Sequence, residues 1–323
     1  MCRTSSAHCV CPRLRALVEN TSCPSGAVPD TEPVTHIPGA GQDPTAILGL
    51  INTLHGKEFE LVGRLAGGRQ GGAWRVSVPG GVDAVLKWSE NASLRSRRSQ
   101  VPAMVGDLRR RGYPTPAWLV SGVTEQGLSY VVSEFVDGDA GSWSSIPLRE
   151  VLAAIELQAG LGEPATETWS TYVEWVLSSD DGPLGDLRAM GRQGQGIVDH
   201  YQRVLAPFKD CRLPDEDLVH GDFSTANLLV RDGRLVAIVD IEAIGPGTRV
   251  VDYAWLLREA YSENAPAADK ALIQQAGQNI AGQGVLAKCA AATALDIVAF
   301  ENRRGEIDYS DLIESMHQLA ENL

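Results

Sequence analysis

Five short runs in the first half of the chain alternate apolar and polar residues, which is typical of half-buried β-strands. They are EFELVGRL (58–65), AWRVSV (73–78), VDAVLKW (82–88), AWLVSGV (117–123) and LSYVVSEFV (128–136). Glycine and proline occupy most of the short segments between these runs, as they do in tight turns. The pattern therefore predicts an antiparallel sheet.

Two helices are predicted close to these strands. Residues 93–111 have helical spacing apart from an interruption at Pro102, and Gly112 ends the pattern. The stretch DPTAILGLINTLHG (43–56) also has helical spacing, and Asp43 is placed to cap its first turn. The first of these helices separates the third and fourth strands along the chain.

The pattern changes after residue 136. Apolar residues there recur at intervals of three and four, which is the period of an amphipathic helix. Seven such stretches follow: 148–161, 169–178, 196–208, 251–262, 266–282, 285–302 and 308–322. A mainly helical region is therefore expected to follow the sheet.

These elements define the predicted domains. Residues 1–43 lack periodicity and are rich in Ser, Pro, Thr, Gly and Cys, so we expect a disordered tail. An alternative is that the start site of the gene is placed too far upstream. We expect residues 44–136 to form a small antiparallel-sheet N-terminal lobe and residues 137–323 to form a larger helical C-terminal lobe, which makes the fold class α+β.

The charge of the chain is acidic and unevenly distributed. The net charge is −13, which argues against nucleic acid as a partner. Residues 1–136 carry 14 basic and 11 acidic side chains, whereas residues 137–323 carry 14 basic and 30 acidic side chains. The acidic second part would attract a cationic substrate, although charge that only maintains solubility would look the same.

The sequence argues against a membrane protein and against a zinc protein. No run approaches the roughly 18 apolar residues of a membrane span, and no apolar leader is present, so we expect a cytoplasmic protein. Four of the six cysteines lie near the N-terminus, and their spacing does not fit a zinc site.

The segment AGGRQGGAW (66–74) places four glycines between the first two predicted strands, namely Gly67, Gly68, Gly71 and Gly72. Glycine lets backbone amides approach a phosphate closely, so this segment is a candidate phosphate-binding loop. A glycine-rich hairpin without a ligand is the alternative. Arg69 is either a phosphate contact or a solvent-exposed tip.

Lys87 lies within the apolar run AVLKW, where Leu86 and Trp88 are expected to face the other side of the sheet. A lysine on a buried strand face is costly unless it is paired, and a phosphate group is a suitable partner. The alternative is a lysine on an edge strand with its ammonium group in water.

Oxygen ligands are concentrated in two neighbouring stretches, LVHGDFSTANLLV (218–230) and VDIE (239–242). The carboxylate of Asp222 can accept a hydrogen bond from a substrate hydroxyl, and the amide of Asn227 offers an oxygen ligand suited to Mg²⁺. Asp240 would bring a carboxylate to the same ion from the end of the next strand, and Glu242 is a further candidate. A set of loop-capping Asx residues is the alternative.

This combination of motifs resembles the aminoglycoside phosphotransferase and choline kinase family, which shares the bilobal protein-kinase-like fold. The resemblance rests on HGDFSTANLLV followed by IVDIE, and on the order of glycine-rich loop, strand lysine, EFV and HGD. It implies that Asp222 is the catalytic base and that Asn227 and Asp240 hold Mg²⁺. Lys87 would contact the α- and β-phosphates of ATP, and His220 would brace the catalytic loop.

The resemblance also implies roles for further residues, whose chemistry alone does not mark them as part of a site. Residues 67–72 would cover the phosphates. The backbone of Glu134, Phe135 and Val136 would form the linker that meets the adenine ring. Asp252 is expected to be structural. The sequence does not distinguish ATP from GTP.

One departure from the family pattern concerns the partner of the strand lysine. Family members pair this lysine with a helix glutamate, but no glutamate lies between Glu90 and Gly112. Gln100 is the best-placed substitute, with Asp107 as the alternative. A neutral glutamine would attract the ammonium group of Lys87 less strongly than a carboxylate.

We therefore predict an ATP- and Mg²⁺-dependent phosphotransferase that moves the γ-phosphoryl group to a hydroxyl of a small molecule. Only eleven residues separate Asp240 from Asp252, which leaves no room for the activation loop of a protein kinase. An aminoglycoside-type or other antibiotic is the favoured substrate. The alternatives are a metabolic kinase for choline, an amino alcohol, homoserine or a sugar, and a nucleotide-binding pseudokinase. The oligomeric state is not indicated.

Substrate contacts are expected from acidic or aromatic residues of the helical part. The acidic candidates, which could equally be solvated, are Asp180, Asp181, Glu301 and Asp308. The aromatic candidates, which form either a stacking platform or part of the core, are Trp169, Tyr172 and Trp175.

Overall fold

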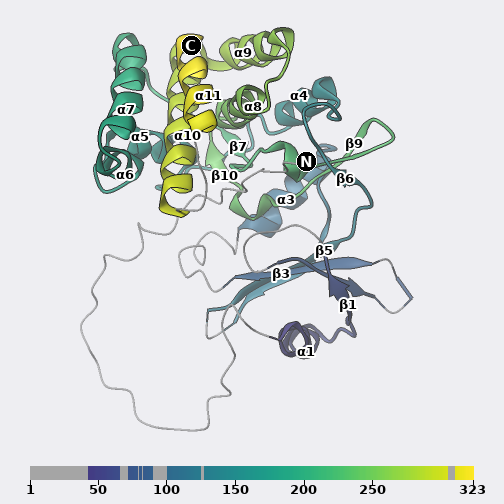
Figure 1. Ribbon diagram of the computed structural model, residues 1–323. Helices are drawn as coiled ribbons and strands as arrows, with labels where there is room; N and C mark the ends of the chain where they lie inside the picture. The colour runs from purple at the N-terminus through teal and green to yellow at the C-terminus, as the bar shows by residue number, and fades with distance from the viewer. Residues whose placement is uncertain are drawn as a thin grey trace, which may run out of the picture. The chain divides into compact units, whose positions relative to one another are not determined.

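The computed structural model describes residues 43–65, 72–78, 80–81, 83–89, 100–124, 127–304 and 310–323 (Figure 1). These residues divide into two compact units. The sheet unit contains the described residues up to Val105 together with Pro116–Val136, and the helical unit contains Gly106–Thr115 and the described residues from Asp137 onwards. The predicted disordered tail, except for Asp43, lies outside the described residues.

The sheet unit is built on five antiparallel strands, which confirms the predicted sheet. The strands are β1 (Glu60–Arg64), β2 (Trp74–Ser77), β3 (Ala84–Ser89), β4 (Trp118–Val123) and β5 (Ser129–Glu134). Their spatial order is β1-β2-β3-β5-β4, because β5 inserts between β3 and β4. Strand β3 is therefore central, with hydrogen-bonded neighbours on both sides.

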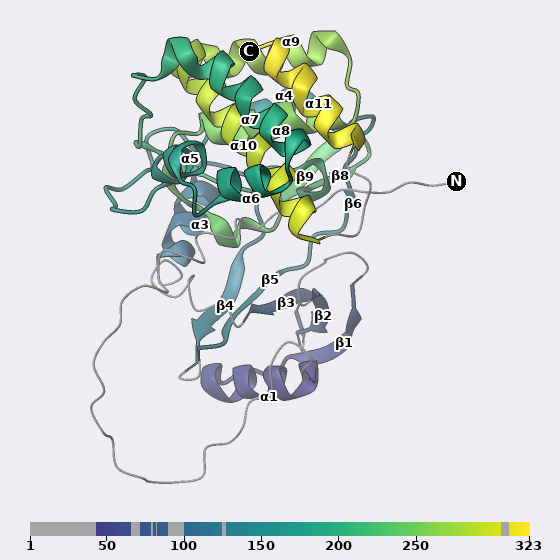
Figure 2. The same ribbon diagram turned by 60° about the vertical axis from the view of Figure 1, so that its left-hand side comes forward.

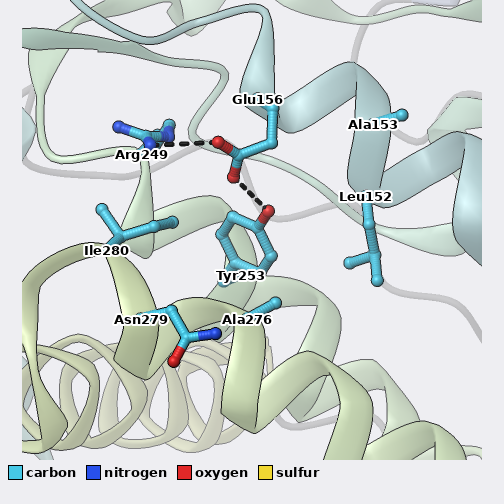
Figure 3. A pocket seen from close by; sticks show the side chains of 8 residues that line it. All are labelled: Leu152, Ala153, Glu156, Arg249, Tyr253, Ala276, Asn279 and Ile280. Atoms are coloured by element: carbon cyan, nitrogen blue, oxygen red, sulfur yellow. Dashed lines mark hydrogen bonds and ion pairs between the residues drawn. The ribbon is translucent and has the colours of Figure 1, made fainter.

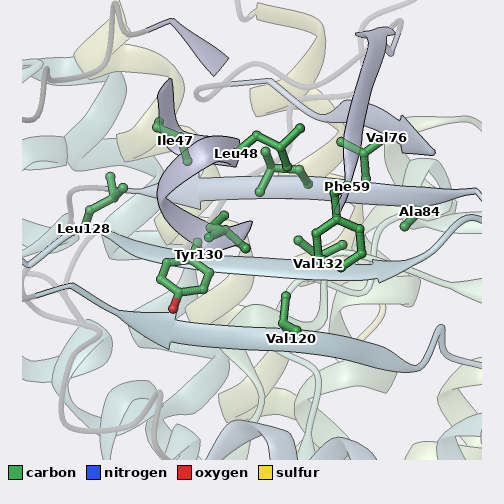
Figure 4. Close-up of a cluster of buried hydrophobic side chains, with 11 residues drawn as sticks. Ile47, Leu48, Phe59, Val76, Ala84, Val120, Leu128, Tyr130 and Val132 are labelled. Atoms are coloured by element: carbon green, nitrogen blue, oxygen red, sulfur yellow. The ribbon is translucent and has the colours of Figure 1, made fainter. Parts of the chain in front are cut away.

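Helix α1 (Pro44–His55) contributes to the core on one face of this sheet (Figure 4). Asp43 caps it as predicted, since its carboxylate accepts a hydrogen bond from the amide of Thr45 at 2.9 Å. The core cluster consists of Ile47, Leu48, Ile51, Phe59, Val76, Ala84, Leu86, Val120, Leu128, Tyr130 and Val132. Because Leu86 belongs to this cluster, the alternation along β3 turns Lys87 towards the opposite face.

Helix α3 (Val101–Arg110) includes Pro102, so the expected interruption at this residue is wrong. Pro102 occupies the first turn, where a missing backbone N–H costs no intrahelical hydrogen bond. The predicted end of the helix is confirmed. Gly112 has a φ of 89°, and the amide of Tyr113 donates to the carbonyl oxygen of Leu108 at 3.0 Å.

The helical unit consists mainly of α-helices. Together with the sheet of the other unit, these helices confirm the predicted α+β class. They are α4 (Leu148–Glu156), α5 (Trp169–Ser178), α6 (Pro183–Ala189), α7 (Arg192–Leu205), α8 (Val250–Ser262), α9 (Ala267–Ala281), α10 (Gln283–Arg304) and α11 (Ser310–Glu321). The short helix α6 has no counterpart among the sequence predictions. Figure 2 shows α7, α10 and α11 lying side by side.

Helix α10 is largely buried, and it packs against α5, α6, α7, α8 and α9. Its mean hydropathy reaches 1.4 over an 18-residue window, so the expectation that no segment is apolar enough to span a membrane is wrong for this helix. Since 83% of that window is buried inside the structure, α10 has the character of a core helix.

Short strands between the helices hold the polar motif. Strand β7 (Asp217–Val219) pairs with β10 (Gly245–Gly247), and β6 (Asp139–Ala140) pairs with β8 (Leu228–Arg231), which pairs with β9 (Arg234–Ile238). The segment 220–227 runs from the end of β7 to the start of β8. Both ends of this segment are therefore fixed by strand pairing.

We predict that Ile51→Ala lowers the free energy of unfolding by about 2–5 kcal/mol, because Ile51 is 0% exposed in the core of the sheet unit. Leu54→Ala on the same helix serves as the matched control. Leu54 is 56% exposed, so its replacement should change stability by less than about 0.5 kcal/mol. Urea unfolding followed by circular dichroism measures both values. Equal losses for the two variants would contradict the packing of α1.

Candidate active site

Asp252, in the first turn of α8, holds the start of the polar loop. Its carboxylate accepts hydrogen bonds from the backbone amides of His220 at 2.8 Å and Gly221 at 2.9 Å. The side-chain amide of Gln158 donates to the same carboxylate at 2.9 Å. The side chains of Asp252, His220 and Gln158 are fully buried. This helix terminus therefore fixes the direction in which the chain leaves β7.

Burial raises the pKa of Asp252 to about 6. The hydrogen bonds from Gly221, His220 and Gln158 act in the opposite direction, because they stabilise the ionised form, but they offset only part of the desolvation. These contacts agree with the structural role predicted for Asp252, which is a buried acceptor for the loop.

His220 ties the loop to the neighbouring strand end. Its Nε2 lies 3.0 Å from the carbonyl oxygen of Val239, and its Nδ1 lies 3.3 Å from the backbone amide of Asp222. The two contacts are compatible when Nε2 carries the proton and donates, while Nδ1 accepts. The ring also meets Phe223 edge to face, with 5.6 Å between centroids. This side chain is thus placed to brace the loop.

Gly221 is required by its surroundings. Its φ is 80°, a conformation that other residues rarely adopt, and a Cβ at this position would overlap the indole ring of Trp169. The indole in turn donates its Nε1 proton to the carbonyl oxygen of Ala243 at 3.2 Å. Trp169 therefore packs between the loop and the segment that follows Asp240.

The structure brings Asp222, Asn227 and Asp240 together. The side-chain amide of Asn227 donates to the carbonyl oxygen of Asp222 at 2.9 Å, which leaves the amide oxygen for another contact. The backbone amide of Val239 donates to the carbonyl oxygen of Asn227 at 2.9 Å, and this contact fixes the strand end that precedes Asp240. Asp240 has a φ of 63° and starts the 3-10 helix η4 (Ile241–Ala243).

The carboxylate of Asp222 is fully buried, and neither of its oxygens has a hydrogen-bond partner among the described residues. Burial, followed by the charge of Asp240, raises its pKa well above the usual value. The charge of Arg258 and the side chain of Asn227 lower the pKa, but they do not compensate. A buried acid beside a second acid creates a negative potential that a bound cation would relieve.

The donor set fits Mg²⁺. The described residues contain no cluster of three or more His, Cys, Asp or Glu side chains that could hold a metal ion by themselves. Two carboxylates and an amide oxygen suit a hard cation that keeps water and substrate phosphates as its other ligands. Asn227 and Asp240 would hold the ion, and the half-buried Glu242 in η4 stays a candidate.

Lys87 lies on the central strand β3, opposite Val131 of β5, so the alternative of an edge-strand lysine is wrong. Its side chain is half-buried on the face opposite the core. Gly72, two residues before β2, has a φ of 84°, and a Cβ there would lie 3.1 Å from the guanidinium of Arg64. The other predicted loop residues, Gly67, Gly68, Arg69 and Gly71, lie outside the described residues.

The predicted linker is anchored to the sheet. The carboxylate of Glu134 accepts a hydrogen bond from the amide of Ala117 at 2.9 Å, and the amide of Phe135 donates to the carbonyl oxygen of Asp83 at 2.9 Å. The guanidinium of Arg75 lies over the Phe135 ring at 4.5 Å. The half-buried Val136 follows. Adenine binding by this segment stays a prediction.

The substitute for the helix glutamate also stays a prediction. Gln100 is exposed immediately before α3, and its carbonyl oxygen accepts a hydrogen bond from the amide of Ala103 at 3.0 Å. Asp107 forms an ion pair with Arg110 three residues further along α3.

The candidate substrate contacts differ in their environment. Asp180 is exposed and pairs with Arg188, whereas Glu301 is 7% exposed. Asp181 is exposed, and Asp308 lies outside the described residues. Among the aromatic candidates, Trp169 and Tyr172 are buried, and Trp175 is half-buried against Tyr172 with 5.6 Å between the ring centroids. The first two are therefore core residues and not a platform.

Sequence reasoning missed a network behind the loop (Figure 3). Arg249 pairs with Asp217 at 2.9 Å and with Glu156 at 3.0 Å, and the hydroxyl of Tyr253 donates to Glu156 at 2.5 Å. These side chains anchor β7, which leads into the loop. Arg249, Glu156 and Tyr253 also line a cavity of about 530 Å³ between α4, α8 and α9, and no predicted site residue contributes to it. No local pattern marks these pairs, because their partners lie far apart in the sequence.

Comparison with known proteins identifies relatives of this chain. A model of the phosphotransferase enzyme family matches residues 62–289. An aminoglycoside 3'-phosphotransferase of Salmonella typhimurium is 36% identical over 174 residues, which cover 45% of this chain and 62% of that relative. The chain thus spans less than two thirds of the length of that relative.

Solved structures show the same fold. A thermostable mutant of aminoglycoside phosphotransferase APH(4)-Ia, in a ternary complex with AMP-PNP and hygromycin B, is 16% identical with a TM-score of 0.61, over 85% of this chain and 98% of that chain. Choline kinase LicA from Streptococcus pneumoniae is 13% identical with a TM-score of 0.56, over 86% of this chain and 97% of that chain. The predicted kinase-like fold is confirmed.

We predict that Gly221→Ala destabilises the protein by roughly 3 kcal/mol or more, because strained backbone and overlap with Trp169 act together. Gly233→Ala is the matched control. Its φ of 73° imposes similar strain, but no atom lies within 4 Å of the new Cβ, so a loss of about 1–2 kcal/mol is expected. Thermal unfolding compares the two variants. A smaller effect at Gly221 than at Gly233 would exclude the contact with Trp169.

Proposed function

Since the chain belongs to the phosphotransferase enzyme family, we propose that it transfers the γ-phosphoryl group of ATP to a hydroxyl of a cationic small molecule. The single observation that carries this proposal is the carboxylate of Asp222, which is buried without a hydrogen-bond partner among the described residues, beside Asn227 and Asp240. Such an arrangement costs stability and is typical of a functional site.

Each residue has a distinct task in the proposed reaction. Asp222 accepts a hydrogen bond from the acceptor hydroxyl, orients its oxygen for in-line attack and takes its proton as the new P–O bond forms. The bond between the γ-phosphorus and the β,γ-bridging oxygen breaks at the same time, and ADP leaves with the electron pair. Asn227 and Asp240 would hold Mg²⁺, which would neutralise phosphate charge. Lys87 would contact the α- and β-phosphates from β3. Residues 67–72, of which only Gly72 lies among the described residues, would cover these phosphates.

Positioning supplies most of the proposed rate acceleration, because phosphoryl transfer needs alignment and charge neutralisation more than covalent catalysis. His220 and Asp252 serve this purpose by holding the loop on both sides of Gly221. The linker at Glu134, Phe135 and Val136 would receive the adenine ring. ATP is the favoured donor, with GTP as the alternative, and the reaction is expected to take place in the cytoplasm.

An aminoglycoside-type antibiotic is the favoured substrate. The relative from Salmonella typhimurium is an aminoglycoside 3'-phosphotransferase, and the structural neighbour holds hygromycin B together with a nucleotide analogue. The excess of acidic over basic side chains in residues 137–323, 30 against 14, would attract a polycation. Choline is the second candidate, because it is also cationic and the choline kinase LicA has the same fold.

We predict that Asp222→Asn lowers kcat by at least about 100-fold while nucleotide affinity stays within a few-fold of the wild type, since the lost function is that of the general base. A coupled assay of ADP formation and isothermal titration calorimetry with a non-hydrolysable ATP analogue measure the two quantities. Asp232→Asn, in the exposed turn between β8 and β9, is the control and should keep full activity. Near-normal turnover by Asp222→Asn would remove this residue from its role.

We also predict selective phosphorylation of cationic acceptors. The protein would be incubated with ATP and Mg²⁺ in the presence of aminoglycosides, choline, homoserine and neutral sugars, and each product examined by mass spectrometry for the gain of one phosphate. An aminoglycoside should be modified at least about 10-fold faster than the neutral sugars, because an acidic surface concentrates cations. Faster modification of a sugar would contradict the substrate class, and binding of Mg·ATP without any product would favour a pseudokinase.

A further inference from the structure

We propose that Glu263 is a positioning residue for the segment from Asp222 to Asn227, on which it acts through Thr225. This inference rests on the proposed function. One oxygen of the Glu263 carboxylate accepts a hydrogen bond from the hydroxyl of Thr225 at 2.6 Å, and the other accepts one from the backbone amide of Trp143 at 2.9 Å.

Thr225 is well placed to transmit this contact. It is 0% exposed and begins the 3-10 helix η3 (Thr225–Asn227), which ends on the predicted metal ligand. A hydrogen bond from a hydroxyl to a carboxylate is short and strong, so it restrains the start of η3. A displacement of Thr225 would move Asn227 away from its partner Asp222.

The second oxygen of Glu263 holds a neighbouring segment against the same site. The indole of Trp143 donates to Asp269 at 3.1 Å, so two acidic residues fix this turn. The preceding Gly141 donates its amide proton to the carbonyl oxygen of Leu228 at 2.8 Å. A Cβ at Gly141 would lie 2.9 Å from the carbonyl oxygen of Thr225, which shows how closely the two segments approach. Glu263 thus joins them directly behind η3.

The location of Glu263 gives α8 a role at both of its ends. Asp252 in the first turn holds His220 and Gly221, and Glu263, immediately after the last turn, holds Thr225. A helix is stiff, so the two contacts set a fixed distance between the beginning of the loop and its end. A carboxylate at a helix C-terminus opposes the helix dipole, and the contacts with Thr225 and Trp143 account for its presence there.

Two variants disturb the contact from opposite sides. Thr225→Val deletes the hydroxyl and keeps the shape of the side chain, and Glu263→Gln leaves only one of the two acceptor oxygens. We expect Thr225→Val to lower kcat by at least about 10-fold and to raise several-fold the Mg²⁺ concentration that gives half the maximal rate. A loss of this size corresponds to about one hydrogen bond to a charged group. Thr225→Ser, which keeps the hydroxyl, should recover most of both losses. Glu314→Gln, at an exposed position of α11, is the control and should match the wild type.

Hydrogen exchange of residues 220–230 gives a readout that does not depend on turnover. Thr225→Val and Glu263→Gln should accelerate exchange of these amides. The double variant should add little to either single variant, because both act on the same contact. A lower melting temperature with unchanged exchange, kcat and Mg²⁺ requirement would show a purely structural role and overturn the inference. A wild-type protein that transfers no phosphate, combined with faster exchange in the variants, would overturn the proposed function and leave the positioning role of Glu263 intact.

Discussion

The site depends on two hydrogen bonds that the carboxylate of Asp252 accepts from backbone amides. Because His220 and Gly221 donate to one buried side chain, the chain must leave β7 in a single direction. Gly221 then passes the ring of Trp169 with a φ of 80°, and His220 reaches the carbonyl oxygen of Val239. The loop is thereby clamped between α8 and the end of β9 before its catalytic part begins.

This rigidity explains how the protein tolerates an unfavourable carboxylate. Asp222 is buried, lacks a hydrogen-bond partner among the described residues and is repelled by Asp240. A flexible loop would relieve this strain by turning the side chain into water, whereas the contacts around Asp222 prevent such a movement. The energy for holding it in place comes from packing and hydrogen bonds elsewhere in the helical unit, which is the usual compensation at active sites.

The sequence predicts those features that depend on local spacing. The five strands, the cap at Asp43 and most helices follow from periodicity and turn residues, and Asp222, Asn227 and Asp240 lie close together because a short hairpin separates them. Local spacing does not reveal contacts such as that between Gln158 and Asp252, which are 94 residues apart. The expectation of an interruption at Pro102 was wrong, because the effect of a proline depends on its position in the helix, and Pro102 lies in the first turn.

Crystals of the protein grown with Mn²⁺ and a non-hydrolysable ATP analogue would test the central claim most directly. Mn²⁺ occupies oxygen-ligand sites of the same kind as Mg²⁺, and its anomalous scattering locates it without ambiguity. The account predicts a peak within about 2.5 Å of the Asn227 amide oxygen and an Asp240 carboxylate oxygen, a coordination distance for hard cations. A nucleotide-bound structure in which the peak lies elsewhere, with Asn227 and Asp240 free of metal, would contradict it.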